Sequence, residues 1–159
     1  MDTIDTIMKS IVNLRVHIAP VGFEVDRIVI PALDQKADKV WLIAHSNVSE
    51  DLAVKYRENV ENELKKNGIK VEIVYANRLR LSPIIKTVAD IIHKERKNDI
   101  YVNVASGSKI HAIGCMMACM LFDDREKIHP FYAQAEKYPE YDGTLQQTYG
   151  VAEVYPLPT

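Results

Sequence analysis

The sequence has few cysteines, no long apolar run and no secretory start, and each absence excludes a class of protein. Its 159 residues include only two cysteines, Cys115 and Cys119, which cannot build a disulfide framework. No apolar run approaches the roughly 18 to 20 residues that span a bilayer. The start, Met1 to Ser10, mixes charged and apolar residues instead of showing a signal peptide. We therefore expect a cytoplasmic protein with no membrane partner.

The chain also lacks an excess of positive charge. Its formal net charge is −2 and its pI is near 6.2. Sequence-independent attraction to DNA or RNA usually needs a basic face on the domain. A nucleic-acid-like ligand would therefore have to be small and held locally. The length and the 47% of hydrophobic residues are typical of one globular domain.

Several common catalytic motifs are missing. There is no G-x-G-x-x-G after the first predicted strand and no G-x-x-x-x-G-K-[ST] anywhere, so readings as a dinucleotide oxidoreductase or a P-loop NTPase lose their main support. Neither G-x-S-x-G nor H-E-x-x-H occurs. The sequence therefore assigns no catalytic residue and no cofactor.

Strand and helix patterns alternate through the first half of the chain. Residues 15–19 alternate as a short strand, and residues 25–33 have the three/four apolar spacing of a helix. Pro31 is expected to kink this helix or to delay its start. The continuous apolar run of residues 39–45 indicates a strand covered on both faces. A second helix is predicted to begin at Ser49 as its N-cap and to run to about Asn67.

The alternation continues in the second half. A third strand covers residues 70–75, and Ser82 followed by Pro83 predicts the N-cap and first residue of a third helix. A fourth strand over 99–105 leads into a helix over 109–122. Two last strands are expected over residues 128–135 and 148–155, joined by the loop 136–147. The sequence leaves open whether they pair with each other or flank the sheet separately.

Four such alternations predict an α/β fold of the Rossmann-like, doubly wound kind, with a mostly parallel sheet of about six strands and helices on both faces. The whole chain, 1–159, is expected to form one ligand-binding domain. Residues 1–14 are interpreted as an N-terminal extension. The proline-punctuated end, residues 156–159, is interpreted as the start of a linker to an absent effector domain.

Open parallel sheets bind ligands beyond the carboxyl ends of their strands, where the strand order reverses. This rule selects four loops, residues 20–23, 45–48, 76–81 and 105–109. The turn after the fourth strand is the most informative of these ends. Gly107 allows close backbone approach, the serines and free helix N–H groups are donors, and Lys109 adds a cation, which together suit phosphate. The alternative is that the glycines only make turns. The candidate ligand-binding residues are Pro20, Val21, Gly22, Phe23, His45, Ser46, Asn77, Ser106, Gly107, Ser108 and Lys109.

A metal site is not expected. His111, Cys115 and Cys119 share one helix face, but they span roughly 12 Å at 1.5 Å per residue, too far for one zinc ion. The cysteines are better explained as small buried hydrophobes. Their helix is apolar almost all round, so either a partner subunit or central burial must cover it. His17, within the first strand, is predicted to be a hydrogen-bonded core histidine.

Two segments resemble a known family. The opening Ala19-Pro20-Val21-Gly22-Phe23 and the later Asn103-Val104-Ala105-Ser106-Gly107-Ser108-Lys109 are similar to the CRISPR-associated Rossmann fold (CARF) family. The likeness is greatest to the N-terminal domain of archaeal CARF/winged-helix transcription regulators. This chain has one glycine where the commoner family motif has two.

The resemblance implies a homodimer that binds one cyclic oligoadenylate, with the tetra-adenylate favoured, across its two-fold axis. It further implies regulation of transcription in CRISPR-linked defence, with DNA contacted only through a domain not in this chain. Two alternatives stay open: a slow, metal-independent ring nuclease, and an oligomerisation domain without a ligand. The sequence favours the sensor over either alternative.

Overall fold

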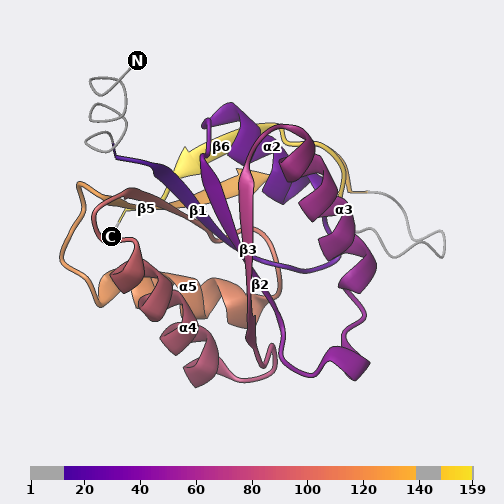
Figure 1. The fold of residues 1–159 in the computed structure, drawn as a ribbon, viewed down its shortest axis with the longest axis horizontal. Coiled ribbons are helices and arrows are strands. Elements are labelled where there is room, and N and C mark those ends of the chain that lie inside the picture. Colours follow the sequence, from indigo (N-terminus) through magenta and orange to yellow (C-terminus); the bar gives the residue numbers. More distant parts are fainter. Residues whose placement is uncertain (1–12, 139–147, 159) are drawn as a thin grey trace, which may run out of the picture.

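A six-stranded sheet in the order β3-β2-β1-β4-β5-β6 has helices on both of its faces (Figure 1). This computed structural model describes residues 13–138 and 148–158. β1 to β5 run parallel, and β6 pairs antiparallel with β5. The predicted doubly wound α/β class is confirmed. The elements are β1 (Arg15–Pro20), α2 (Asp26–Asp34), β2 (Lys39–His45), a 3-10 helix η1 (Val48–Glu50), α3 (Val54–Lys66), β3 (Lys70–Ala76), α4 (Leu81–Lys94), β4 (Asp99–Asn103), α5 (Lys109–Met120), β5 (Ile128–Gln134) and β6 (Glu153–Pro156).

The two halves of the core lie on opposite faces of the sheet because alternate side chains of a strand point to opposite sides. On β1, Val16 and Ile18 belong to the core beneath α4 and α5, whereas Ala19 belongs to the core beneath α2 and α3. The apolar residues of β2 contribute to both cores: Ile43 belongs to the core beneath α4 and α5, and Leu42 to the core beneath α2 and α3. Each such side chain contributes about 1.5–3 kcal/mol through burial, so the central strands hold the two layers of helices together.

Pro31 lies inside α2 and does not delay its start, which is at Asp26. A proline has no N–H, so the carbonyl four residues earlier, that of Arg27, loses its helical donor. The side chain of Asn103, at the end of β4, replaces it: Asn103 Nδ2 donates to the Arg27 carbonyl oxygen at 2.8 Å. The proline is tolerated because a buried amide from the sheet completes the helix.

Two predicted helix caps are wrong. Ser49 lies inside η1, where its hydroxyl donates to Asn47 Oδ1 at 2.9 Å, and the N-cap of α3 is Ala53. Asp51 then accepts from the Ala53 N–H in an extended connection, and α3 begins only at Val54. Ser82 is the second residue of α4, because the N-cap is Arg80, whose backbone is extended, two residues earlier than predicted.

The last predicted strand is shorter than expected and begins at Glu153. Two of the preceding residues bind the start of α2, whereas the Ala152 N–H still donates to the carbonyl of Gln134 in β5 at 2.9 Å. The Thr148 hydroxyl donates to Glu24, and the Gly150 N–H donates to Asp26 Oδ2 at 2.7 Å. Most of the predicted loop 136–147 lies outside the described residues, as does most of the predicted extension 1–14. Pro156, expected at the start of a linker, is the last residue of β6.

The buried histidine and cysteines lie as the sequence predicts, with one exception. Cys115 and Cys119 are free and buried in the core beneath α4 and α5, and burial raises the pKa of both thiols, that of Cys119 to about 12. His17 is buried and its ring stacks on that of Tyr101, with 5.2 Å between the two ring centroids. Burial, and then the charge of Arg15, lowers the pKa of His17 to about 3. Its Nε2 has no hydrogen-bond partner, so it is not the fully bonded histidine that was predicted.

Within the described ranges, no helix combines the length and the apolar character that crossing a membrane requires.

Replacing Asn103 with alanine should lower the free energy of unfolding by about 3 kcal/mol, because buried main-chain groups at Arg27, Ala105 and Ser106 would lose their partner. Adding Pro31→Ala should restore about 1 kcal/mol in that background, because it supplies a helical N–H to the Arg27 carbonyl. Urea unfolding of the two single variants and the double variant measures this coupling. Strict additivity would contradict the assigned role of Asn103.

Candidate functional site

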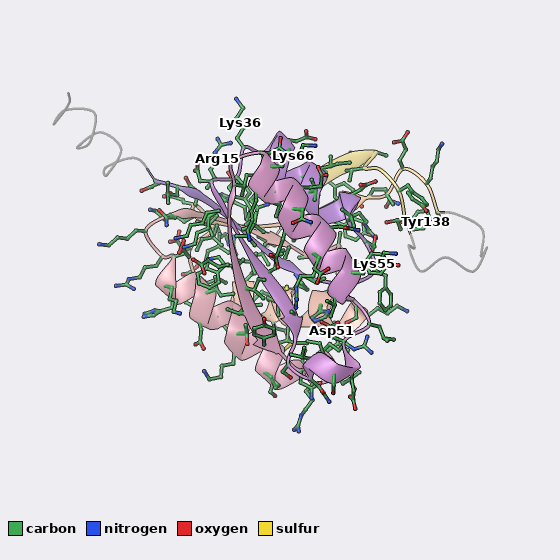
Figure 2. The ribbon with its side chains drawn as sticks, turned by 45° about the vertical axis from the view of Figure 1, so that its right-hand side comes forward. Arg15, Lys36, Asp51, Lys55, Lys66 and Tyr138 are labelled. Carbon is green, nitrogen blue, oxygen red and sulfur yellow. The ribbon has the colours of Figure 1, made fainter. Side chains whose placement is uncertain are left out.

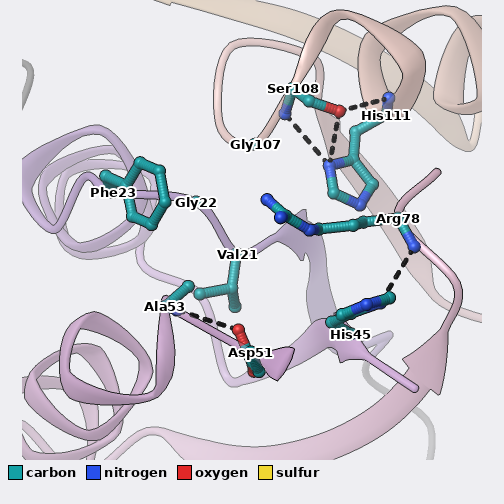
Figure 3. Close-up of a pocket in the computed structure, with 10 residues that line it drawn as sticks. All are labelled: Val21, Gly22, Phe23, His45, Asp51, Ala53, Arg78, Gly107, Ser108 and His111. Carbon is teal, nitrogen blue, oxygen red and sulfur yellow. Dashed lines mark hydrogen bonds between the residues drawn. The ribbon is translucent and has the colours of Figure 1, made fainter. Parts of the chain in front are cut away.

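A cavity of about 230 Å³ opens where four parallel strands end (Figure 3). It lies at the switch point between β1 and β4, where the strand order reverses. The four predicted loops all contribute to it, together with the segment before α3 and the first turn of α5. Figure 2 shows Asp51 at this end of the molecule, opposite the end where Arg15 and Lys36 lie. The lining residues are Val21, Gly22, Phe23, His45, Asp51, Ala53, Arg78, Gly107, Ser108 and His111.

The loop after β1 and the turn after β4 meet at two glycines. A Cβ on Gly22 would lie 3.0 Å from Gly107 Cα, closer than real Cβ contacts usually come. Gly107 has φ +80°, and a Cβ there would lie 2.6 Å from His111 Nδ1. Both glycines therefore allow close backbone approach in addition to making turns. This contact fixes the floor of the pocket.

Ser108 and His111 form a capping box at the start of α5. Ser108 Oγ accepts from the His111 N–H at 3.3 Å, and the Ser108 N–H donates to His111 Nδ1 at 3.0 Å. Histidine here takes the place of the usual glutamate or glutamine. The N–H of Ser108 holds the imidazole ring against the helix start, so His111 is fixed in the pocket wall.

The electrostatics keep His111 neutral. Burial is the main cause, and the nearby charges of Arg78 and His45 add to it, so that the pKa of His111 falls to about 4. Because Nδ1 accepts a main-chain N–H, the single ring proton of neutral His111 resides on Nε2. The ring therefore offers a donor, and no free acceptor, to a ligand.

His45 is held in the same way by the loop after β3. The N–H of Arg78 donates to His45 Nδ1 at 3.2 Å. Figure 3 shows the Arg78 side chain extending between His45 and His111. Three nitrogen-rich side chains, from the end of β2, the loop after β3 and the first turn of α5, thus gather in one wall of the pocket. Asp51, whose Oδ1 accepts from the Ala53 N–H, is the carboxylate in the lining.

The structure brings some of the predicted site residues together in this pocket and leaves others outside it. Ser106 is fully buried, and its Oγ has no hydrogen-bond partner. Lys109 is exposed as the first residue of α5. Predicted residues that line the pocket are Val21, Gly22, Phe23, His45, Gly107 and Ser108, whereas Pro20, Ser46, Asn77, Ser106 and Lys109 do not.

Four lining residues were missed as site residues: Asp51, Ala53, Arg78 and His111. The spacing Ser108-x-x-His111 was a usable signal for the last, since it matches a capping box with a different acceptor at its fourth position. Arg78 lay inside a predicted site loop, but nothing in the sequence distinguished it from Arg80. Among residues 13–138 and 148–158, no group of three or more His, Cys, Asp or Glu side chains is arranged to hold a metal ion.

Gly107→Ala should destabilise the protein more than Gly68→Ala, because both glycines have a positive φ but of these two only Gly107 is crowded. Gly68 has φ +77° and nothing within 4 Å of an added Cβ, so its substitution should cost about 1 kcal/mol in unfolding free energy. Gly107→Ala should cost about 1–3 kcal/mol more, through overpacking against His111 and Pro20. Chemical denaturation of the two variants measures the difference. Equal losses would mean that the close approach at Gly107 is not a constraint.

Three solved structures share the fold. The chain superposes on Can2 from Sulfobacillus thermosulfidooxidans, solved with cyclic tetra-adenylate, with a TM-score of 0.59 and 13% identity over 78% of this chain and 33% of that one. It superposes on Enterococcus italicus Csm6, solved with cyclic hexa-2′-fluoro-hexa-dAMP, with a TM-score of 0.64 and 10% identity over 93% and 43%. For VC1899 from Vibrio cholerae the TM-score is 0.56, with 15% identity over 76% and 30%. The fold is CARF-like.

A sequence relative is known from an archaeon. The chain is 36% identical over 128 residues to the uncharacterized protein MJ1513 of Methanocaldococcus jannaschii. This match covers 77% of this chain and 38% of that protein. The matches thus cover 38% of MJ1513, 33% of Can2 and 43% of Csm6, less than half of the length of each. A family model described as "HFX_2341_N:-like, N-terminal" matches residues 15–138. Because this match covers most of the chain, the protein belongs to the HFX_2341_N:-like, N-terminal family.

Proposed function

We propose that this chain is a sensor domain that binds a cyclic oligoadenylate, with cyclic tetra-adenylate favoured, at the interface of a homodimer. The observation that carries the proposal is the pocket at the β1–β4 switch point, whose wall joins hydrogen-bond donors to the apolar side chains of Val21 and Phe23. A nucleotide offers matching parts, since its phosphate accepts hydrogen bonds and its base is an apolar plane. Can2 and Csm6, which share the fold, were solved with ligands of this kind.

The size of the pocket supports a ligand shared between two copies. Its volume of about 230 Å³ is below the roughly 300–1,000 Å³ of pockets that enclose a drug-sized ligand. One chain therefore encloses one part of a ring of four nucleotides. A second copy related by a two-fold axis would enclose the opposite part, as the symmetry of such a ring requires.

The outer face of α5 supports the homodimer. Its buried face carries Cys115 and Cys119, so the apolar residues opposite them are left at the surface. In the described chain this face is not covered, which leaves a second copy as the cover in our proposal. The exposed apolar residues are Ile110, Ile113, Met117, Met120 and, just after the helix, Leu121, with exposed fractions from 37% to 69%. We call this set the α5 stripe.

The chemistry of the pocket favours sensing over cleavage. Ring cleavage by attack of a ribose 2′-hydroxyl on the adjacent phosphate gains from a base that removes the hydroxyl proton. Nδ1 of both His45 and His111 already accepts a main-chain N–H, and Nε2 carries the ring proton. Donors of this kind stabilise phosphate in the ground state as well as in the transition state, and such uniform binding does not raise the rate of the chemical step.

The effector in this proposal lies outside the chain. The match spans 38% of MJ1513, so most of that relative lies outside it, which is room for a separate effector domain. We propose that the ring regulates transcription through a DNA-binding domain joined to this one, in CRISPR-linked defence. The formal charge of −2 suits a domain that does not itself contact DNA.

Cyclic tetra-adenylate should bind the purified protein at one ring per two chains and should stay intact. Lys109 lies outside the cavity, but it is exposed and directly follows the lining residue Ser108, so in this proposal it contacts the part of the ring that extends beyond the pocket. Lys109→Ala should then weaken binding about a hundredfold or more, because a charge-assisted contact contributes about 1.5–3 kcal/mol and a two-fold ring would lose two of them. Calorimetric titration with the tetra- and hexa-adenylate rings measures affinity, stoichiometry and ring size.

The alternatives separate in the same samples. Labelled ring is incubated for an hour with excess protein and no metal, and the products are then resolved. Complete conversion within minutes, lost in Lys109→Ala or His45→Ala, would replace the sensor with a ring nuclease. Absence of binding by either ring would leave the oligomerisation domain.

Met117→Glu should convert the protein to a monomer without unfolding it, because Met117 is 44% exposed in the single chain and would bring a charge into the α5 stripe of both copies. Leu33→Glu on α2 is the matched control, since Leu33 is 36% exposed and lies away from the stripe. Sedimentation at micromolar concentration, with circular dichroism of each variant, measures the effect. A wild-type monomer with and without the ring would refute the dimer.

A further inference from the structure

Within residues 13–138 and 148–158, Arg78 is the charged side chain of the pocket that lacks a hydrogen-bond or ion-pair partner. Its Nε is shielded from solvent and makes no hydrogen bond. No carboxylate in the described part of the chain lies within ion-pair distance of its guanidinium. A shielded N–H of a charged group without an acceptor is costly, since it has lost water and gained nothing in exchange. An acceptor supplied by a ligand would remove that cost.

The two histidines beside Arg78 cannot be that acceptor. Nδ1 of each ring is occupied by a main-chain N–H, so in the neutral form both rings carry their proton on Nε2. His45, Arg78 and His111 therefore present donors only. The positive charge of Arg78 is also close enough to His111 to lower the pKa of that ring. Three donor side chains and one uncompensated charge define a site for a group that is anionic and only accepts hydrogen bonds.

The main chain fixes Arg78 in this position. The Asn77 side chain accepts from the Leu79 N–H at 3.0 Å, and the Asn77 carbonyl accepts from the Arg80 N–H at 3.1 Å, which makes a tight turn directly after β3. The N–H of Arg78 itself is held by His45. The side chain therefore leaves the turn toward the pocket (Figure 3), and the predicted site residue Asn77 acts by shaping this turn.

We propose that Arg78 is the phosphate-recognising residue of this pocket, binding a phosphodiester or phosphate ester between His45 and His111. The identity of the whole ligand rests on the proposed function, but the subsite itself requires only a phosphate group. The planar guanidinium donates two parallel N–H bonds to two phosphate oxygens, a geometry that a lysine cannot reproduce. Asp51, the carboxylate in the lining, repels the phosphate and so favours its placement at the histidine wall.

The first test measures cyclic tetra-adenylate binding by calorimetry. Arg78→Ala should weaken binding about tenfold to a hundredfold or more, because a charge-assisted bond is lost in each copy. Arg78→Lys should restore only part of this loss, since it keeps the charge without the paired donors. Arg80→Ala is the matched control: Arg80 is exposed, two residues away and outside the pocket lining, and its removal should leave affinity unchanged. Thermal unfolding of each variant checks that the fold is retained.

The second test uses 5′-AMP as a probe that does not need the ring. Proton NMR should show the His45 and His111 ring signals shifting on addition of AMP to the wild type, and not shifting in Arg78→Ala. If the ring binds the wild type and Arg78→Ala equally well, the role of Arg78 is wrong and the proposed function stands. If no ring binds but AMP shifts both histidines through Arg78, the phosphate subsite stands and the proposed function fails. If neither probe binds the wild type, both fail.

Discussion

The side-chain amide of Asn103 is the interaction on which the rest of the site depends. From the end of β4 it donates to the Arg27 carbonyl in α2 at 2.8 Å and accepts from the N–H groups of Ala105 and Ser106 at 2.9 and 3.1 Å. One buried amide therefore satisfies a carbonyl that Pro31 leaves without a donor and also ends the strand. Because unpaired buried polar groups are costly, these hydrogen bonds fix the turn after β4 to helix α2.

The pocket is built outward from that lock. With Ala105 and Ser106 held, Gly107 turns through its positive φ against Gly22, and Ser108 is then in place to start α5. The same hydrogen bonds that complete the backbone also decide the chemistry of the side chains. Each pocket histidine accepts one main-chain N–H, which sets its tautomer and leaves it a donor. The main-chain hydrogen bonds to the two histidines thus leave a pocket wall of donors, which suits an anion and contains no free imidazole base.

The sequence was sufficient for the fold because its strands are strongly marked. The apolar run of β2 and the strand–helix alternation predicted the parallel sheet. Binding beyond the carboxyl ends of the strands selected four loops that line the pocket, but not the segment before α3 that adds Asp51 and Ala53. The errors arose where two local options compete. Ser49 bonds to Asn47 instead of capping a helix, and Thr148 and Gly150 bind the start of α2 instead of pairing with β5. The direction of loop side chains is set by tertiary contacts, so the sequence did not separate Arg78 from Arg80 or place Lys109 outside the cavity.

The position of α5 connects the pocket to the surface that the proposed dimer would use. The helix begins at the capping box of Ser108 and His111 in the pocket wall, and its outer face carries the α5 stripe. A phosphate held between the histidines and Arg78 would bind directly beside the first turn of this helix, where its N–H groups favour negative charge. In a dimer that packs stripe against stripe, any shift of the helix on binding would change the fit of the two copies. By linkage, a dimer arrangement that places the pockets favourably would bind the ring more tightly, and the ring would stabilise that arrangement by the same free energy. A rigid helix shared by site and interface is therefore sufficient to turn ligand binding into a change of assembly, and no catalytic step is needed.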